Sequence, residues 1–306
     1  MATDDHILRD RFEGCLLGLA IGDALGGRFE AQSPDAIRAR FPSVESLIAY
    51  PQDEIWYTDD TQMAIGLAES LVECGEVVEE PLCRAFVSNY LPSRGYGRGA
   101  RAVLDAMEDG RDYRTIAEDY FPGGSYGNGA AMRVAPVGLL FRDDHKRLWE
   151  QARLSALPTH THQLGIEGAR LLALAVALGS TTESFDGDTF FGTLSAACDS
   201  QEYRAKLGEA SRVKSPDDLA SLGNQIEAIH SAPTAIASFA LTPNSFEATI
   251  GNVILLGGDT DTLAAMAGAI SGAHLGAKQL PSRLVELLES STKGRDYIRQ
   301  LAGRLF

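Results

Sequence analysis

The sequence predicts an all-α fold. Apolar residues recur every three or four positions along most of the chain, which is the spacing that covers one face of a helix. Runs that alternate apolar and polar residues never exceed a few positions, so strands are not expected. No fixed repeat indicates a solenoid. The prediction is therefore one helical domain spanning residues 1–306, with its functional loops at helix N-termini on one face.

Composition narrows the classes of function. There are 42 acidic residues against 27 basic ones, which gives a net charge of −15. This balance argues against a nucleic-acid-binding or anionic-membrane surface, because either needs a basic face, but not against an anionic small ligand. The four cysteines lack CxxC pairing, which favours free thiols and a cytoplasmic location. With no apolar signal core and no run of about 18 apolar residues, no membrane span is expected.

The first predicted helix covers residues 7–25, where an apolar stripe occupies one face. Asp23 falls where this stripe ends, just before paired glycines, and we expect it to be a buried cap or a support for the site. Glu30 follows on the glycine-rich turn. It is the better candidate for a reactive carboxylate, although a solvated loop acid would look the same in the sequence.

Two clusters of carboxylates and hydroxyls precede predicted helices. The first, Thr58-Asp59-Asp60-Thr61, comes before an apolar helix that ends near Gly75. The second, Gly257-Gly258-Asp259-Thr260-Asp261-Thr262, lies between the apolar run at 253–256 and an Ala- and Gly-rich helix predicted over 264–275. The two glycines allow a tight turn, and Asp259 is suited to cap the helix that follows.

Together these clusters predict a metal site. Such groups are costly to bury without a partner, and hard cations favour oxygen ligands. The positive end of a helix dipole keeps carboxylates ionised. If the two helix starts face each other, they offer about six to eight oxygens, enough for two Mg²⁺ ions about 4 Å apart that polarise a substrate and activate a water. The alternative is two unrelated acidic helix caps.

Two glycine-rich stretches are candidate phosphate-binding loops. Residues 94–99 precede a helix predicted over 100–107, which is a weak indication because many turns look alike. In residues 123–129 glycines alternate with Ser, Tyr and Asn before a helix predicted over 134–141, and backbone N–H groups at such a start bind phosphate well. This is not GxGxxG after a strand, so no dinucleotide fold is indicated. Tyr126 could stack on a base or a ribose, and a structural role is favoured for Arg133 over a ligand contact.

The rest of the chain is predicted as further helices. His160 and His162 precede a helix over 164–177; without a nearby Cys or third His, zinc is disfavoured, and a ligand contact or helix cap is expected. Residues 181–222 are polar and poorly patterned, which indicates a peripheral helical lobe that varies between relatives. Helices are also expected to open at 222–228, to restart at 231–235, and to occupy 281–306 as one or two amphipathic segments.

Several motifs occur together and in a fixed order. They are Gly14-Cys15-Leu16-Leu17-Gly18-Leu19-Ala20-Ile21-Gly22-Asp23, the two acidic clusters, Ser125-Tyr126-Gly127-Asn128-Gly129 and Thr159-His160. In this combination, from about residue 11 to 276, the chain resembles the ADP-ribosylglycohydrolases. The resemblance implies an orthogonal all-α bundle with a centre of two Mg²⁺ ions, or Mn²⁺ in their place. The branch that hydrolyses serine-ADP-ribose and poly(ADP-ribose) is the most similar, on Arg94-Gly95-Tyr96-Gly97, Ala131-Met132-Arg133-Val134-Ala135, Leu222-Gly223-Asn224 and Pro233-Thr234-Ala235-Ile236.

Carried over by position, the resemblance implies roles for individual residues. The metal ligands would be Thr58, Asp59, Asp60, Asp259, Asp261 and Thr262. Glu30 would be a mobile acid near the metals, and either it or Asp259 would help to deprotonate the attacking water. ADP-ribose would be bound by Gly95, Gly124, Ser125, Tyr126, Gly127, Asn128 and His160. Residues 181–222 do not align by eye, so selectivity on the target side stays open.

The implied function is Mg²⁺-dependent attack of water at C1″ of ADP-ribose that is linked to an acceptor oxygen. Substrates would be serine-ADP-ribose, poly(ADP-ribose) or O-acetyl-ADP-ribose, so the partners would be ADP-ribose and ADP-ribosylated proteins or small molecules. An arginine-ADP-ribosyl hydrolase would keep the metals and change the leaving group. A non-catalytic ADP-ribose binder or structural protein on the same fold would have lost metal carboxylates, and none is lost here.

Overall fold

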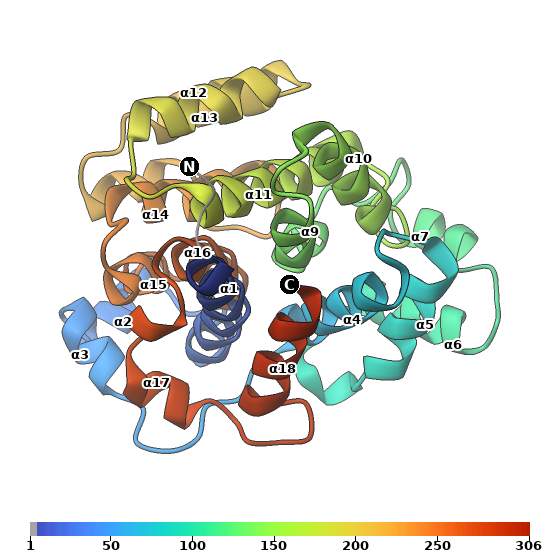
Figure 1. Cartoon of the computed structure of the whole chain (residues 1–306), viewed down its shortest axis with the longest axis horizontal. Helices are drawn as coiled ribbons and strands as arrows, with labels where there is room; N and C mark the ends of the chain where they lie inside the picture. The colour runs from blue at the N-terminus through green and yellow to red at the C-terminus, as the bar shows by residue number, and fades with distance from the viewer. Residues whose placement is uncertain (1–4) are drawn as a thin grey trace.

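Helices make up nearly all of the regular structure in the computed structural model, which describes residues 5–306 (Figure 1). Within that range only two isolated β-bridges occur in place of a sheet, so the all-α prediction is confirmed. The helices are α1 (Asp5–Gly26), α2 (Pro34–Arg40), α3 (Val44–Ala49), α4 (Asp59–Cys74), α5 (Glu79–Asn89), α6 (Arg98–Glu108), α7 (Tyr113–Tyr120), α8 (Gly129–Met132), α9 (Ala135–Leu140), α10 (His145–Ala156), α11 (Gln163–Thr181), α12 (Gly187–Ala197), α13 (Gln201–Ala210), α14 (Ala228–Leu241), α15 (Phe246–Ile254), α16 (Thr260–Leu275), α17 (Ser282–Leu287) and α18 (Arg295–Leu305). Short 3₁₀ segments are η1 (Pro92–Arg94), η2 (Pro216–Ser221) and η3 (Ala277–Gln279).

An antiparallel pair, α1 and α16, lies at the centre of the molecule (Figure 1). Glycines recur at every fourth position of α1, so they share one face of the helix. A Cβ atom added to any of them would lie 2.0 to 2.4 Å from a carbonyl oxygen of α16, so the two backbones are in direct contact. The facing pairs are Gly14 with Gly272, Gly18 with Gly268, Gly22 with Ala264, and Gly26 with Thr260. This contact brings the C-terminus of α1 to the N-terminus of α16, where their opposite partial charges attract.

Helix α11 packs against α9, α10, α14 and α16. It is long and apolar enough to cross a membrane by length and composition, which the sequence prediction did not anticipate because Glu167 and Arg170 interrupt its apolar run. Within the fold, however, 78% of its most apolar window is buried by protein. Its hydrophobicity therefore serves the core of the bundle.

Most predicted helices are present, with small shifts at their ends. The helix predicted over 7–25 is α1, and the one expected to end near Gly75 is α4, whose C-cap Gly75 has a φ of 71°. The prediction that a helix opens at 222–228 and restarts at 231–235 is wrong. Instead α14 starts at Ala228 and continues through Pro233 without a break. Residues before it form a loop because Gly223 has a φ of 102° and the Asn224 amide donates to two carbonyl groups of the 256–257 turn.

Residues 181–222 form α12, α13 and η2, and Figure 1 shows α12 and α13 along the outer edge beyond α11 and α14. Helix α12 contacts α11, and α13 contacts α14. Their variation between relatives, and the assignment of 1–306 to one domain, stay predictions.

Candidate active site

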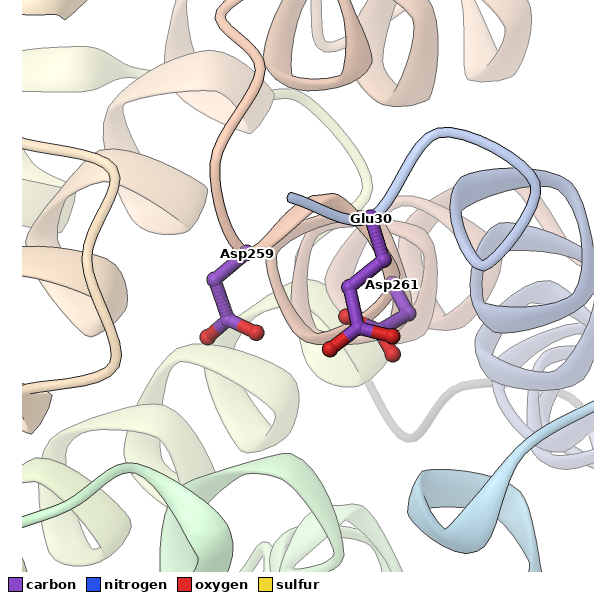
Figure 2. A group of neighbouring side chains, drawn as sticks. All are labelled: Glu30, Asp259 and Asp261. Carbon is purple, nitrogen blue, oxygen red and sulfur yellow. The ribbon is translucent and has the colours of Figure 1, made fainter. Parts of the chain in front are cut away.

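Three carboxylates meet where α1 ends and α16 begins. One oxygen each of Glu30, Asp259 and Asp261 lies within 4.8 Å of the others, and Figure 2 shows the three side chains pointing the same way. Glu30 is carried by the turn after α1, which pairs with the turn before α16. The Ala31 N–H donates to the carbonyl of Gly258 (2.8 Å), and the Gly258 N–H donates to the carbonyl of Gln32 (3.0 Å). These backbone bonds fix the Glu30 turn beside Asp259.

The turn that aims Asp259 depends on two consecutive glycines. Gly257 and Gly258 have φ values of 67° and 77°, which other residues rarely adopt. A Cβ on Gly257 would lie 2.4 Å from the Gln32 carbonyl oxygen, and one on Gly258 would lie 2.5 Å from the Asn224 carbonyl oxygen. That same Asn224 carbonyl accepts the N–H of Asp259 at 3.0 Å. Both conformation and space therefore require glycine here.

The other acidic cluster lies at the start of α4 and is held by Asp23. The Asp23 carboxylate accepts the N–H of Thr58 (2.9 Å), the N–H of Thr61 (3.0 Å) and the hydroxyl of Thr61 (2.5 Å). Asp23 is fully buried. The prediction that it is a buried cap is confirmed, with the detail that it caps α4 from the end of α1.

The two helix starts face the same space. A Cβ on Gly27 would lie 3.0 Å from the Thr58 methyl group and 3.9 Å from the Asp261 Cβ, so both clusters converge on the end of α1. Asp59 and Asp60 are also close enough to Asp259 to interact with it electrostatically. Thr58 donates its hydroxyl to Asp60 (3.3 Å), and Asp261 accepts the N–H of Thr262 (2.9 Å). All six predicted metal-ligand residues therefore lie around one acidic site.

The charged groups that act most strongly on Asp59, Asp60 and Asp261 are other carboxylates. Burial, and then the nearby Asp259 and Glu30 carboxylates, raise the pKa of Asp261 to about 9. Burial and then Asp23 raise the pKa of Asp59 to about 7, and similar causes raise that of Asp60 further. One oxygen of Asp60 is buried without a hydrogen-bond partner. A divalent cation would remove both the repulsion and the orphaned acceptor, so the residues present fit a metal.

The predicted phosphate loop lies directly beside these carboxylates. Asn128 donates its side-chain N–H to a carboxylate oxygen of Asp259 at 2.5 Å. Its backbone N–H donates to the carbonyl of Ile226 (2.8 Å), and Ala228 donates to the carbonyl of Tyr126 (3.1 Å), so the loop is held against the start of α14. Gly124 has a φ of 91°, which helps the loop turn. The loop and the acidic site therefore form one continuous surface.

Exposed apolar side chains border the loop. Tyr126 is 52% exposed and meets the His162 ring edge-on at 5.7 Å, and Ile226 is 65% exposed. Phe121 is partly exposed and precedes the loop, with its carbonyl accepting the Gly124 N–H (2.7 Å). Tyr126 was predicted from the sequence as a ligand contact, whereas Phe121 and Ile226 were not. The only sequence signal for Phe121 was an apolar residue in a polar stretch, and Ile226 fell inside a predicted helix.

His160 lies beneath the loop. Arg133 is buried, stacks on Phe86 and donates to the hydroxyl of Thr159 at 2.8 Å, which confirms its structural role. The Thr159 hydroxyl can then donate to Nδ1 of His160 (2.7 Å), which leaves the hydrogen on Nε2. Burial, and then Arg133, lower the pKa of His160 to about 3, so the ring is neutral. Nε2 is 3.6 Å from the Cβ position of Gly127, so His160 presents a donor toward the loop.

Two further residues that were singled out from the sequence, His162 and Gly95, occupy different positions. His162 accepts the N–H of Leu164 (3.2 Å), so it caps α11, as expected for a histidine at a helix start. Gly95 has a φ of 99°, and its Cβ position is 3.5 Å from an oxygen of Asp59. The preceding Arg94 holds it there through a bidentate ion pair with the buried Glu289 (2.5 and 2.8 Å). Glu289 was missed because nothing in its local sequence marks it.

Comparisons with known proteins match nearly the whole chain. A family model described as ADP-ribosylglycohydrolase matches residues 4–306. The ADP-ribosylhydrolase ARH3 of Mus musculus is 34% identical over 97% of this chain and 92% of its own length, and that of Homo sapiens is 34% identical over 97% and 93%. A solved structure described as an ADP-ribosylglycohydrolase-related protein complex has a TM-score of 0.72 over 98% of both chains at 24% identity, which supports the fold.

Proposed function

Because this chain belongs to the ADP-ribosylglycohydrolase family and is thus a hydrolase acting on ADP-ribosylated substrates, we propose that it releases ADP-ribose from O-linked acceptors with the aid of two Mg²⁺ ions. The acceptors in this proposal are serine, the next unit of poly(ADP-ribose), or acetate. The observation that carries the proposal is the convergence of five carboxylates beside a glycine-rich loop. The free state of all four cysteines supports a reducing compartment such as the cytoplasm.

In this proposal ADP-ribose lies across the surface in one direction. The diphosphate would rest on the backbone N–H groups of residues 125–128, with the neutral His160 as a further donor. The adenosine would lie against the exposed Tyr126 and Ile226 side chains, which offer apolar faces. The distal ribose would then reach the carboxylates, because Asn128 joins the loop directly to Asp259.

The chain supplies the groups that hold ions and move a proton. Thr58, Asp59 and Asp60 from α4, with Asp259, Asp261 and Thr262 from α16, would hold the ions. Once bound, the ions would orient the ribose hydroxyls and lower the pKa of a nearby water. One oxygen of Asp259 is already engaged by Asn128, so its other oxygen and the Glu30 carboxylate are the two candidate proton acceptors near C1″. The Glu30 side chain is exposed, so it can move as substrate enters while backbone hydrogen bonds hold its turn in place.

Substitution of the site carboxylates tests the proposal. Asp259→Asn and Asp261→Asn should each abolish release of ADP-ribose from a serine-linked peptide while the helical content stays unchanged. Asp143→Asn is the matched control, because that side chain is 77% exposed and far along the chain from both clusters. Arginine-linked and acetylated substrates, each assayed with Mg²⁺ and with chelator, identify the leaving group. Wild-type release by both site variants, or an undiminished rate in excess chelator, would contradict the proposal.

A further inference from the structure

Two arginines gather around one exposed tyrosine next to the Glu30 turn. The guanidinium carbon of Arg28 lies 5.8 Å from the centre of the Tyr50 ring, and that of Arg40 lies 5.7 Å from the same point. Phe29, between Arg28 and Glu30, packs against the same tyrosine with ring centres 6.4 Å apart. We call the side chains of Arg28, Tyr50 and Arg40 the Arg28–Tyr50–Arg40 patch. It therefore continues directly from the turn that carries Glu30.

The patch is positive and unneutralised. Both arginines are exposed, and among residues 5–306 no carboxylate oxygen lies within 4.0 Å of either guanidinium. Arg38, on the same helix as Arg40, does have a carboxylate partner, Asp217, at 3.7 Å. The chain as a whole carries a net charge of −15, so most of its surface repels an anion. A local positive patch beside the acidic site thus offers an anionic substrate a place to dock.

The position of the patch relative to the ligand surface indicates which part of a substrate would reach it. The phosphate loop contacts the acidic site through Asp259, and Glu30 is the carboxylate carried by the adjoining turn. If the diphosphate lies on the loop and the distal ribose lies at the carboxylates, the group bonded to C1″ must leave the site away from the loop. Because Glu30 lies with Asp259 and Asp261, its turn would border that exit, and Arg28 is two residues earlier in the turn.

We propose that the Arg28–Tyr50–Arg40 patch binds the next unit of an ADP-ribose chain through its diphosphate. This inference rests on the proposed function. In a polymer, the group bonded to C1″ is the adenosine ribose of the following unit, and its diphosphate brings two negative charges near the site. Guanidinium groups bind phosphate oxygens in bidentate fashion, and both guanidinium carbons lie within 5.8 Å of the centre of the Tyr50 ring. A single ADP-ribose on a neutral peptide has nothing to place there.

Charge-reversal variants test the inference by comparing two substrates. For Arg28→Glu and Arg40→Glu, the ratio of kcat/KM on ADP-ribose polymer to that on a serine-mono-ADP-ribosylated neutral peptide should fall about tenfold, since attraction is replaced by repulsion. Lys146→Glu is the matched control. It makes the same change in charge at an exposed residue of α10, which lies across the molecule from α2 and α3 (Figure 1), and it should leave the ratio unchanged.

The outcomes separate the inference from the proposed function. If the wild type releases ADP-ribose from neither substrate, the proposed function fails. If it acts on both, and the arginine variants lose activity equally on both or on neither, the patch does not bind the polymer. A third substrate, a mono-ADP-ribosylated peptide with acidic flanks, identifies the ligand. An equal loss on this peptide and on the polymer would overturn the inference, because the patch would then recognise acidic side chains rather than a second unit.

Discussion

Replacing Gly258 by alanine should damage both stability and turnover, and Gly75 offers a matched control. Both glycines have a left-handed backbone, with φ values of 77° and 71°. They differ in their surroundings. A Cβ on Gly258 would lie 2.5 Å from the carbonyl oxygen and 2.8 Å from the amide nitrogen of Asn224, whereas one on Gly75 would meet nothing within 4 Å. Comparing the two variants therefore separates the cost of conformation from the cost of crowding.

The expected magnitudes follow from these contacts. A left-handed alanine costs about 1–2 kcal/mol, offset by about 0.4–1 kcal/mol because alanine also restricts the unfolded chain. Gly75→Ala should thus lose about 1 kcal/mol of unfolding free energy. Gly258→Ala adds about 1–3 kcal/mol of overpacking, which gives about 2–4 kcal/mol in total. An unfolding entropy of about 2.1 cal/mol/K per residue over 306 residues converts these losses to about 1.5 °C and about 3–6 °C in Tm.

Turnover gives a second, independent readout. Relief of the crowding must move either Asn224 or the turn, and the Asp259 N–H is bonded to that same Asn224 carbonyl. Because a displacement of about 1 Å can cost about a hundredfold in rate, kcat of Gly258→Ala should fall at least about tenfold. Thermal unfolding and steady-state release of ADP-ribose measure the two effects. Equal Tm losses in the two variants, together with wild-type turnover in Gly258→Ala, would refute the inference that contact with Asn224 requires glycine at position 258.

Four further predictions concern the acidic site and its support. Burial and like charges raise the pKa of Asp261 to about 9 and that of Asp59 to about 7, above the values near 4 of an unfolded chain. Between about pH 4 and pH 9, the folded metal-free protein therefore holds protons that the unfolded chain has lost. Its Tm should fall as pH rises through that range. A rise in Tm over the same range would contradict the prediction. Mg²⁺ competes with those protons, so the Tm gain on adding it should be larger at high pH than at low pH when followed by calorimetry. Asp261→Asn removes a group that must take up a proton when the metal-free protein folds at neutral pH, so it should raise the metal-free Tm there. It should also weaken the Mg²⁺ response, and an undiminished response would exclude Asp261 as a ligand. Glu289→Gln weakens the ion pair with Arg94, so it should cost about 1–3 kcal/mol in unfolding free energy. Because Arg94 precedes Gly95, the substitution should also loosen Gly95 and raise KM. A wild-type KM would disprove this role of Glu289.

Long helices with a clear apolar stripe could be predicted from the sequence, whereas the short helices α2 and α3 could not. Helix α1 has 22 residues, enough for its 3.6-residue period to show. Helix α2 has seven residues and α3 has six, less than two turns each, and both depend on serine caps at Ser33 and Ser43. The start of α14 was mistaken because the loop before it is fixed by hydrogen bonds from Asn224 to a turn more than 30 residues away.

The candidate site also combines features that local sequence predicts with features that only the tertiary fold creates. The acidic clusters could be identified because carboxylates next to apolar sequence are costly to bury without a partner. Their convergence depends on α1 and α16 packing antiparallel, a contact between segments more than 200 residues apart that no local pattern encodes. Glu289 and Ile226 carry ordinary local sequence and acquire their positions only from the tertiary fold. The chemistry of the site could thus be predicted from the sequence better than the framework that supports it.

The glycine face of α1 also limits how this protein can diverge. An insertion or deletion of one residue between Gly14 and Gly26 would rotate everything beyond it by about 100° around the helix axis, and bulkier side chains would then be forced against α16. The length of this segment should therefore stay constant among functional descendants, even where its outward residues drift. New specificities would have to arise through changes in the surrounding loops.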